Sequence, residues 1–328
     1  MPMIDLSVVI PVRNEAASLD ELHAELSNTL RAWGRSYELI VIDDGSTDES
    51  FETLARLQAV DPHLTVIRFR RNFGQTAAFA AGFDHARGRI IVTSDGDLQN
   101  DPRDIPAMVE AVERGADIVC GWRKNRRDAF LSRRLPSIIA NGLISFVTGV
   151  HLHDYGCSLK AFRAEIVKSM KLYGEMHRFL PAIASEQTSN IVERVVNHRP
   201  RKHGRSNYGI SRTIRVVLDL LTVKFLLSYS TRPLHIFGLI GGTMGLAGLV
   251  LTGWLGFWRL MGSLSLNQHQ PLLLLGIVLM FTGVQLVTVG LLAEMQARTY
   301  HESQNKPTYA IREILPGSGR TTRVVANG

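Results

Sequence analysis

The first 120 residues alternate between short hydrophobic runs and longer amphipathic stretches. The runs are rich in β-branched residues, as buried strands are, and the stretches between them have the length and amphipathic character of helices. The expected strands are Leu6–Ile10, Glu38–Ile42, Leu64–Phe69, Arg89–Thr93 and Asp117–Cys120. The expected helices are Ser18–Trp33, Asp48–Val60, Gln75–Arg87 and Ile105–Arg114. This alternation predicts an α/β domain built on a mostly parallel sheet.

Further along the chain the pattern changes to two long uncharged stretches. Arg259 is the only Asp, Glu, Lys or Arg from Pro233 to Ala293. Each stretch exceeds the roughly 20 apolar residues that cross a bilayer core, so we expect membrane spans at about Leu234–Trp258 and Pro271–Ala293. A buried helical hairpin in a soluble protein is the alternative, but soluble cores rarely contain two uncharged runs of this length.

Glycines recur in both expected spans. They are Gly238, Gly241, Gly242, Gly245 and Gly248 in the first span, and Gly276, Gly283 and Gly290 in the second. Small residues spaced four apart let two helices approach closely in a membrane. We therefore expect these glycines to pack the two spans against each other or to join copies of the chain in a homo-oligomer.

The distribution of charge favours one orientation of the spans. The chain carries 37 Lys and Arg against 30 Asp and Glu, a net charge of +7, yet the expected loop Met261–Gln270 has no Lys or Arg. The positive-inside bias then places both termini in the cytoplasm, where Cys120 and Cys157 stay reduced. No cleavable signal is evident at the N-terminus. Because membrane spans explain the basic flanks, no nucleic-acid partner is expected.

Polar residues follow the expected strands, whose carboxyl ends share the sheet edge where ligands bind. Asp95 and Asp97 follow the fourth strand and would point the same way in an extended segment. With the Gln99 amide oxygen they make an all-oxygen set suited to Mg²⁺ or Mn²⁺, which would neutralise a diphosphate leaving group. A solvated acidic turn is the alternative interpretation of an isolated D-x-D.

The second strand is followed by Asp43-Asp44-Gly45-Ser46. Ser46 or Asp48 suits the N-cap of the next helix. An additional pair of aspartates is more than a cap requires, so we expect Asp44 to accept hydrogen bonds from a base or ribose. The chain has no G-x-G-x-x-G after the first strand and no Walker lysine loop, which argues against a dinucleotide dehydrogenase or a P-loop nucleotidase.

Six motifs, taken together and in order, resemble a known enzyme family. They are PVRNE (11–15), VIDDGSTD (41–48), RNFGQTAAFAAG (71–82), SDGDLQNDP (94–102), DYGCSLKAF (154–162) and HGRSNYG (203–209). The set is similar to family-2 glycosyltransferases of the GT-A fold, a Rossmann-like α/β class, and within them to polyprenyl-phosphate sugar transferases such as dolichol-phosphate mannose synthase. The likeness covers nearly the whole chain. It implies a nucleotide-sugar donor, a divalent metal and a lipid-phosphate acceptor.

The resemblance also implies roles for individual residues. The nucleotide-binding positions are matched by Pro11, Asn14, Glu15 and Asp44. The metal and diphosphate positions are matched by Asp95, Asp97 and Gln99, and the catalytic positions by Asp97 and by Asp154, an acid near the sugar and acceptor. Arg13 stands where the family usually has an aromatic residue, and Asn207 where it usually has Lys. These departures affect base stacking and one phosphate contact, respectively.

Two basic runs lie where a lipid phosphate could arrive, at residues 123–134 and 194–215. Positive-inside bias and attraction to anionic lipids explain most of them. Direct phosphate contacts are expected from Arg123, Arg201 and Arg205. Amphipathic stretches at residues 137–150 and 211–229 are expected to lie in the membrane interface, with ordinary core packing as the alternative.

The expected organisation is a cytoplasmic GT-A domain (1–210), an interfacial helix (211–232), a transmembrane hairpin (233–293) and a cytoplasmic tail (294–328). The expected reaction is inverting transfer of a hexose from a UDP-glucose or GDP-mannose type of donor to undecaprenyl or dolichyl phosphate, giving a β-linked product. One alternative is a processive polysaccharide synthase, although this chain lacks the usual Q-x-x-R-W motif. A non-catalytic membrane protein that binds nucleotide sugar is the other.

Overall fold

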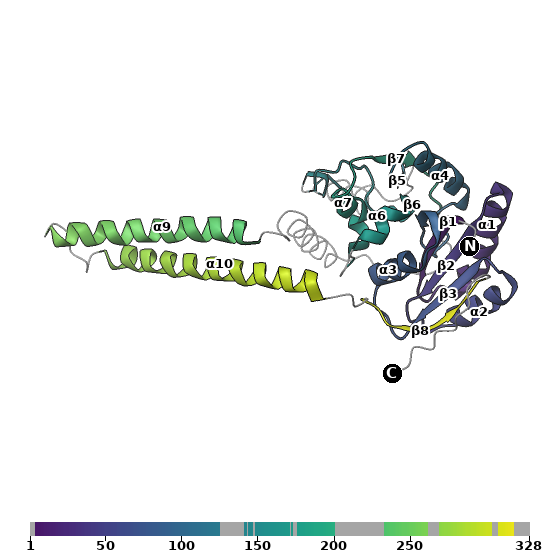
Figure 1. Cartoon of the computed structure of the whole chain (residues 1–328), viewed down its shortest axis with the longest axis horizontal. Helices are drawn as coiled ribbons and strands as arrows, with labels where there is room; N and C mark the ends of the chain where they lie inside the picture. The colour runs from purple at the N-terminus through teal and green to yellow at the C-terminus, as the bar shows by residue number, and fades with distance from the viewer. Residues whose placement is uncertain are drawn as a thin grey trace. The chain divides into compact units, whose positions relative to one another are not determined.

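The computed structural model describes residues 4–124, 141–142, 144–146, 148–170, 172, 176–200, 233–261, 269–303 and 308–317. The chain forms two compact units (Figure 1). The sheet unit comprises Met1–Val223 and Pro307–Gly328, and the hairpin unit comprises Lys224–Lys306.

The sheet unit is built on eight strands in the order β7-β5-β6-β4-β1-β2-β3-β8. Strands β1 to β4 run parallel to one another, whereas β6 is antiparallel to β4 and β5, and β8 is antiparallel to β3. The strands are β1 (Ile4–Val12), β2 (Tyr37–Asp43), β3 (Leu64–Phe69), β4 (Gly88–Thr93), β5 (Ile118–Trp122), β6 (Lys160–Arg163), β7 (Ile191–Val195) and β8 (Ile311–Leu315).

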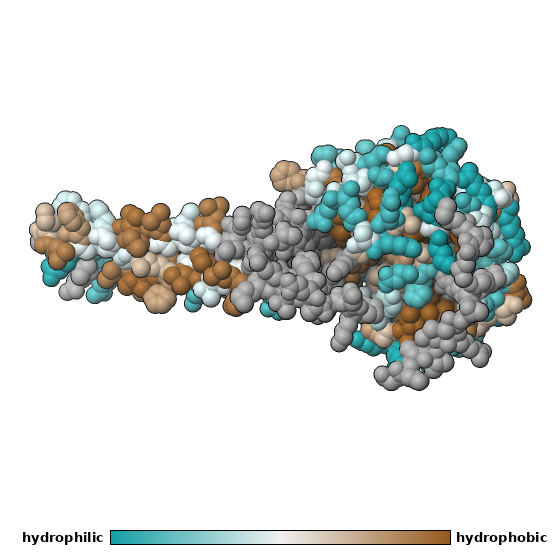
Figure 2. Space-filling model, viewed as in Figure 1, coloured by the Kyte–Doolittle hydropathy of each residue, from teal (hydrophilic) through white to brown (hydrophobic). Residues whose placement is uncertain are grey.

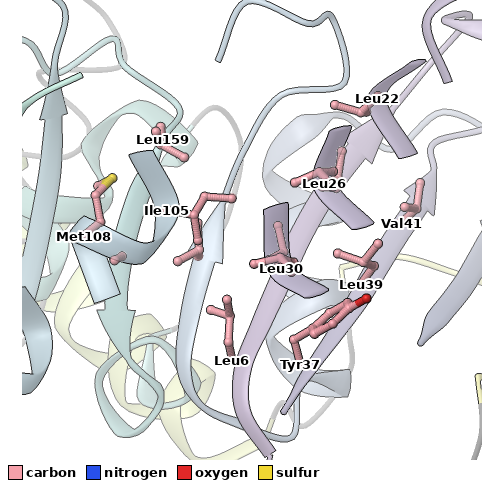
Figure 3. Close-up of a cluster of buried hydrophobic side chains, with 14 of the residues drawn as sticks. Leu6, Leu22, Leu26, Leu30, Tyr37, Leu39, Val41, Ile105, Met108 and Leu159 are labelled. Carbon is pink, nitrogen blue, oxygen red and sulfur yellow. The ribbon is translucent and has the colours of Figure 1, made fainter. Parts of the chain in front are cut away.

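Helices cover both faces of this sheet. The helices are α1 (Ala16–Trp33), α2 (Ser50–Val60), α3 (Gln75–His85), α4 (Ile105–Glu113), α6 (Ala164–Ser169) and α7 (Leu180–Ala184). Leu26 of α1 and Met108 of α4 belong to one buried cluster with Leu6 of β1 (Figure 3). Successive strand residues point to opposite faces, and Val9 accordingly meets α3 on the other side. There a Cβ at Gly82 would lie 2.1 Å from Val9 Cγ1, so the close approach of α3 requires glycine.

The structure confirms the predicted mostly parallel α/β fold. Each of the five expected strands and four expected helices is present, with ends within two residues of the predicted ones. The sequence predicts a separate tail at residues 294–328. The structure instead pairs β8 with β3, from Val66 opposite Leu315 to Phe69 opposite Ile311, so part of this region completes the edge of the sheet.

The hairpin unit contains α9 (Pro233–Leu260) and α10 (Gln270–Ser303). The segments Phe237–Leu260 and Gln270–Ala293 are long and apolar enough to cross a membrane, as predicted. Most of their large apolar side chains are exposed, as the brown surface of the hairpin in Figure 2 shows. A helical hairpin from a soluble core would bury these side chains instead.

Glycines bring the two hairpin helices into contact. A Cβ at Gly248 would lie 2.5 Å from the carbonyl oxygen of Gly276, and one at Gly283 would lie 2.5 Å from that of Gly241. These positions therefore serve packing within the hairpin, which is the first of the two predicted uses. Gly242 has no atom within 4 Å of an added Cβ and lies outside this contact.

Candidate active site

Four loops meet at one edge of the sheet. Because β1 to β4 are parallel, the loops that follow them lie at the same edge. The chain moves from β1 outward to β3 and then returns to β4 on the other side of β1. This reversal is the switch point at which open α/β sheets bind their ligands. The loops span residues 13–15, 44–49, 70–74 and 94–101.

The first loop is hydrogen bonded to the second. Asn14 adopts a left-handed conformation with φ 56°, which asparagine tolerates better than most residues. Its backbone N–H donates to Ser46 Oγ at 3.0 Å, and its Oδ1 accepts from the Thr47 N–H at 2.8 Å. Pro11 and Glu15 flank it, at the end of β1 and just before α1. Asn14 thus contacts the second loop directly, Glu15 donates from its N–H to Ser50 Oγ at the start of α2, and Pro11 lies in β1 opposite Ile42 of β2.

The N-cap residue of α2 is Glu49, not Ser46 or Asp48 as predicted, but the Asp48 side chain bonds to the N-terminus of the helix. Its Oδ1 accepts from the Ser50 N–H at 3.1 Å, and its Oδ2 accepts from the Ala16 N–H at 3.2 Å. One carboxylate therefore serves the N-termini of both α1 and α2. Burial raises the pKa of Asp48, but these hydrogen bonds outweigh burial and leave the pKa below its usual range.

The predicted nucleotide ligand Asp44 is buried, and it organises the third loop. Its two carboxylate oxygens accept from the backbone N–H groups of Phe73, at 2.7 Å, and Gly74, at 3.0 Å. Burial raises the pKa of Asp44, and these two hydrogen bonds oppose the rise. A carboxylate oxygen has two lone pairs, so each oxygen retains acceptor capacity for a further donor group. Asp44 can therefore hold the loop and also accept from a nucleotide.

The fourth loop carries the predicted metal ligands on a bend. Strand β4 ends at Thr93, the chain bends at residues 96–98, and Leu98 has φ 62°, so Asp95 and Asp97 do not lie on the predicted extended segment. Asp95 Oδ1 accepts from Gln75 Nε2 at 2.8 Å, while Asp97 Oδ1 accepts from the backbone N–H of Gln99 at 3.2 Å. The bend rather than strand alternation brings the carboxylates to the edge.

The donor set of this loop fits a hard divalent cation. Burial and the neighbouring Asp97 carboxylate together raise the pKa of Asp95, so the two carboxylates repel each other. A divalent cation would relieve that repulsion. Within the described ranges no three His, Cys, Asp or Glu side chains form a metal cluster, so the Gln99 amide and a substrate phosphate would complete the ligand set.

Asp154 and Arg123, both predicted from the sequence, form a buried ion pair. Arg123 donates from Nε to Asp154 Oδ2 at 2.7 Å and from Nη2 to Oδ1 at 2.9 Å. The two side chains are 13% and 3% exposed. Burial lowers the pKa of Arg123, but the Asp154 carboxylate more than offsets this and holds the guanidinium charged. The sequence predicts separate roles for them, Asp154 near the sugar and acceptor and Arg123 as a phosphate ligand, whereas in the structure their side chains pair with each other.

Two residues of the quoted motifs have contacts that the sequence does not predict. Gln75 donates to Asp95, as described above, and Lys160 donates to two carbonyl oxygens. Lys160, at the start of β6, is 3% exposed and donates from Nζ to the carbonyl oxygens of Tyr155 and Cys157. It thereby closes the turn that follows Asp154. A charged residue inside the apolar run Leu159–Phe162 was the available signal, since lysine is rarely buried without partners.

Arg199, within the second basic run, lies beside the fourth loop. The Arg199 N–H donates to the Gln99 carbonyl oxygen at 2.9 Å, and the Arg199 guanidinium pairs with Asp101 at 2.9 Å. The same guanidinium contacts Glu25 of α1 at 2.7 Å. Residues 201–232 lie outside the described residues, and with them lie the predicted phosphate ligands Arg201 and Arg205, the departure Asn207 and the interfacial helix at 211–232.

The sequence of the sheet unit matches a known family. A family model described as glycosyl transferase family 2 matches residues 7–170, which span all four loops and the Arg123–Asp154 pair. The chain belongs to glycosyltransferase family 2. The predicted family, activity class and GT-A fold are therefore confirmed.

Curated relatives of this glycosyltransferase match it over nearly its whole length. It is 46% identical to the dodecaprenyl-phosphate galacturonate synthase of Rhizobium johnstonii, over 95% of this chain and 93% of the relative. It is 40% identical to the undecaprenyl-phosphate 4-deoxy-4-formamido-L-arabinose transferase of Shewanella sediminis, again over 95% and 93%. Both names identify a polyprenyl phosphate and a sugar.

Among solved structures, the sheet unit resembles the glucosyl-3-phosphoglycerate synthase of Mycobacterium tuberculosis, crystallised with Mn²⁺ and UDP-glucose. The TM-score is 0.55 at 19% identity, and the match covers 67% of this chain and 79% of the other. At this identity the likeness shows the fold alone.

Proposed function

We propose that this glycosyltransferase transfers a sugar from a nucleotide sugar to polyprenyl phosphate, with inversion, giving a β-linked polyprenyl-phosphate sugar. One observation carries the proposal: a four-loop acidic site and two membrane-length helices occur in one chain. The same length of sequence aligns with relatives whose names identify polyprenyl-phosphate glycosyltransferases. A lipid acceptor explains why a nucleotide-sugar site needs a membrane anchor.

The donor nucleotide would bind across the first and second loops, at Pro11, Asn14, Glu15 and Asp44. The hydrogen bonds between these loops fix the Asn14 backbone before any ligand arrives. A fixed site loses less conformational entropy when it binds its ligand. The donor diphosphate would extend from there toward the fourth loop.

Asp95, Asp97 and Gln99 would hold Mg²⁺ or Mn²⁺. Such an ion supplies positive charge against the diphosphate leaving group. Asp97 is only 7% exposed, and a buried carboxylate interacts with charge more strongly than one in bulk water. The loop's own contribution is to hold its carboxylates, through the hydrogen bond from Gln75 to Asp95 and the turn at Leu98.

The acceptor makes a strong general base unnecessary. The second pKa of a phosphate monoester is about 6, so its oxygen is largely ionised at neutral pH. The enzyme must chiefly place that oxygen behind the anomeric carbon and stabilise the departing diphosphate. Asp154 suits a positioning role, because both of its oxygens already accept from Arg123. Arg123 would contribute positive charge to a substrate phosphate, and Arg201 and Arg205 are the further proposed phosphate ligands.

The site would face the cytoplasm. Strand β8 follows α10 in the chain and pairs with β3, so the chain enters and leaves the hairpin on one side of the membrane. Basic residues flank the hairpin, and the loop at 261–270 has no Lys or Arg. The positive-inside bias then assigns the sheet unit to the cytoplasmic face, where nucleotide sugars occur.

The test incubates the purified full chain with undecaprenyl phosphate, Mg²⁺ or Mn²⁺, and labelled UDP- and GDP-sugars. The panel starts with UDP-galacturonic acid, because the Rhizobium relative is named for galacturonate. We expect label in the organic phase with at least one donor, none after chelation, and a loss of about 100-fold or more in Asp97→Asn. If no donor labels the lipid, or if Asp97→Asn and chelation leave the transfer rate unchanged, the proposal fails.

A further inference from the structure

The segment at residues 308–317, which follows α10, contacts the sheet beside the third loop. Tyr309 stacks on Phe69 with a centroid distance of 5.2 Å and an interplanar angle of 14°. Its hydroxyl donates to Asp84 Oδ2 at 2.7 Å, and the carbonyl oxygen of Ala310 accepts from the Arg70 N–H at 3.0 Å. Two of these contacts hold the segment where β3 ends and the third loop begins, and the contact with Asp84 holds it to α3.

These contacts continue inward to Asp44. Phe69 is 1% exposed and meets Phe73 edge to face at 5.7 Å. The N–H groups of Phe73 and Gly74 are the two that donate to the Asp44 carboxylate. A short chain of packed rings and hydrogen bonds thus runs from Tyr309 to the carboxylate proposed to bind the nucleotide.

The third loop also controls the shape of the second loop. Gly45 has φ +66°, and a Cβ there would lie 2.5 Å from the Arg71 carbonyl carbon and 2.6 Å from the Asn72 nitrogen. The two loop backbones are in contact, so a shift of the third loop would move the residues next to Asp44. Strand β8 restrains that shift by pairing with β3 up to Phe69.

We infer that Tyr309 is a positioning residue for the donor nucleotide, acting through Phe69 and Phe73 on Asp44. The inference rests on the proposed function, in which Asp44 binds the donor. The position of Tyr309 gives the arrangement a further meaning. Helix α10 ends at Ser303, six residues before Tyr309. The residues that support the third loop are therefore among the first to follow the hairpin in the chain. Donor affinity then depends on a segment outside the 7–170 family match.

The experiment compares three full-length variants with the wild-type protein. Tyr309→Ala removes the stacked ring, and Tyr309→Phe removes only the hydroxyl bonded to Asp84. The matched control is Gln58→Ala, which removes the hydrogen bond of 2.7 Å from Gln58 Nε2 to the Pro316 carbonyl oxygen, at the far end of the same segment. For each protein, UDP and GDP affinity, donor KM, acceptor KM, kcat and melting temperature are measured.

Tyr309→Ala should weaken nucleotide binding and raise donor KM by about three- to tenfold, the range that loss of an aromatic pair predicts. Its acceptor KM should stay within about twofold of wild type. Tyr309→Phe and Gln58→Ala should keep nucleotide affinity and donor KM within about twofold, even where the melting temperature falls. If Tyr309→Ala fails to fold, Tyr309→Leu, which keeps apolar volume without a ring, is measured against the same expectations.

The inference is overturned if the ring-deleting variant keeps wild-type nucleotide affinity and donor KM, or if Gln58→Ala changes them as much. It is also overturned if wild-type protein binds neither nucleotide. Failure of the proposed function is a separate result. In that case wild-type protein labels no lipid, while the loss of UDP or GDP affinity in Tyr309→Ala still reports whether the segment positions the nucleotide site.

Discussion

Replacing Asp154 by Asn tests whether the Arg123–Asp154 pair is a buried unit of the site. The substitution keeps the size of the side chain and removes its charge. Arg123 then stays in place with its side chain only 13% exposed and without the carboxylate that it contacts at 2.7 Å and 2.9 Å. We expect a loss of both stability and turnover.

The size of the stability loss follows from burial. Removing one partner of a buried ion pair costs about 3–5 kcal/mol, because the remaining charge is left uncompensated. The amide oxygen of Asn can still accept one hydrogen bond, so we expect the lower end, about 3 kcal/mol. For a domain of this size that corresponds to a fall in melting temperature of about 6–12 °C. If Arg123 contacts the acceptor phosphate as proposed, displacing its guanidinium should also lower kcat by about 100-fold.

A double variant separates the two losses. Asp154→Leu combined with Arg123→Met replaces the ion pair with apolar side chains of similar volume, and such replacements are often neutral or stabilising. The double variant should melt near the wild-type temperature and still transfer no sugar. Melting is followed by thermal shift in detergent, and transfer by label in the organic phase, so the same preparation gives both values.

Three results would refute this reasoning. A wild-type melting temperature in Asp154→Asn would show that the pair does not carry the stability that its burial implies. Full turnover of Asp154→Asn with unchanged acceptor affinity would remove Asp154 from the reaction. An active double variant would show that neither charge is needed for transfer.

Two further predictions concern the loops and acid stability. Gly45→Ala should cost about 1–3 kcal/mol and weaken the binding of whichever nucleotide, UDP or GDP, the wild-type protein binds, because it adds a clash to a φ of +66°. Gly34→Ala, at φ +75° with nothing within 4 Å, should lower the melting temperature less and leave that binding intact. Burial raises the pKa of Asp61, but hydrogen bonds from His63 and His23 outweigh it and leave the pKa lowered. Asp61 therefore stabilises the fold above its unfolded pKa of about 3.9 and loses this contribution as the pH falls through the lower folded pKa. At pH 7 the melting temperature of Asp61→Asn should lie below that of wild type, and the difference should narrow below about pH 4. A difference in melting temperature that does not change with pH would contradict this.

Local sequence pattern was sufficient for the elements of the central sheet. Strand β3 runs from Leu64 to Phe69, as its apolar run predicts, and α1 ends at Trp33, just before Gly34 in the left-handed conformation. These elements bury their apolar residues locally, so periodicity identifies them. The membrane-length helices could be predicted equally well, because soluble cores rarely contain an uncharged run long enough to cross a bilayer.

The sequence does not predict which distant segments pair with each other. The alternating sequence of Ile311–Leu315 fits a strand, but nothing local indicates that its partner is β3, more than 240 residues earlier. The same limit applies to the site. Motif resemblance predicts Asp154 and the basic run at residues 123–134 predicts Arg123, but only the fold brings their side chains within 2.7 Å. Individual site residues can be predicted from the sequence one by one, whereas contacts between distant site residues depend on chain topology.

The pairing of β8 with β3 constrains membrane topology independently of charge. Residues before α9 and residues after α10 belong to the same sheet, so we propose that both lie on one side of any membrane that the hairpin enters. If only one of the two helices crossed the bilayer, β8 would be on the opposite side from its partner strand, and the ladder from Val66 to Phe69 could not form. The hairpin therefore crosses twice or not at all. The exposed apolar surfaces of α9 and α10 favour crossing twice, because in water they would be left unburied.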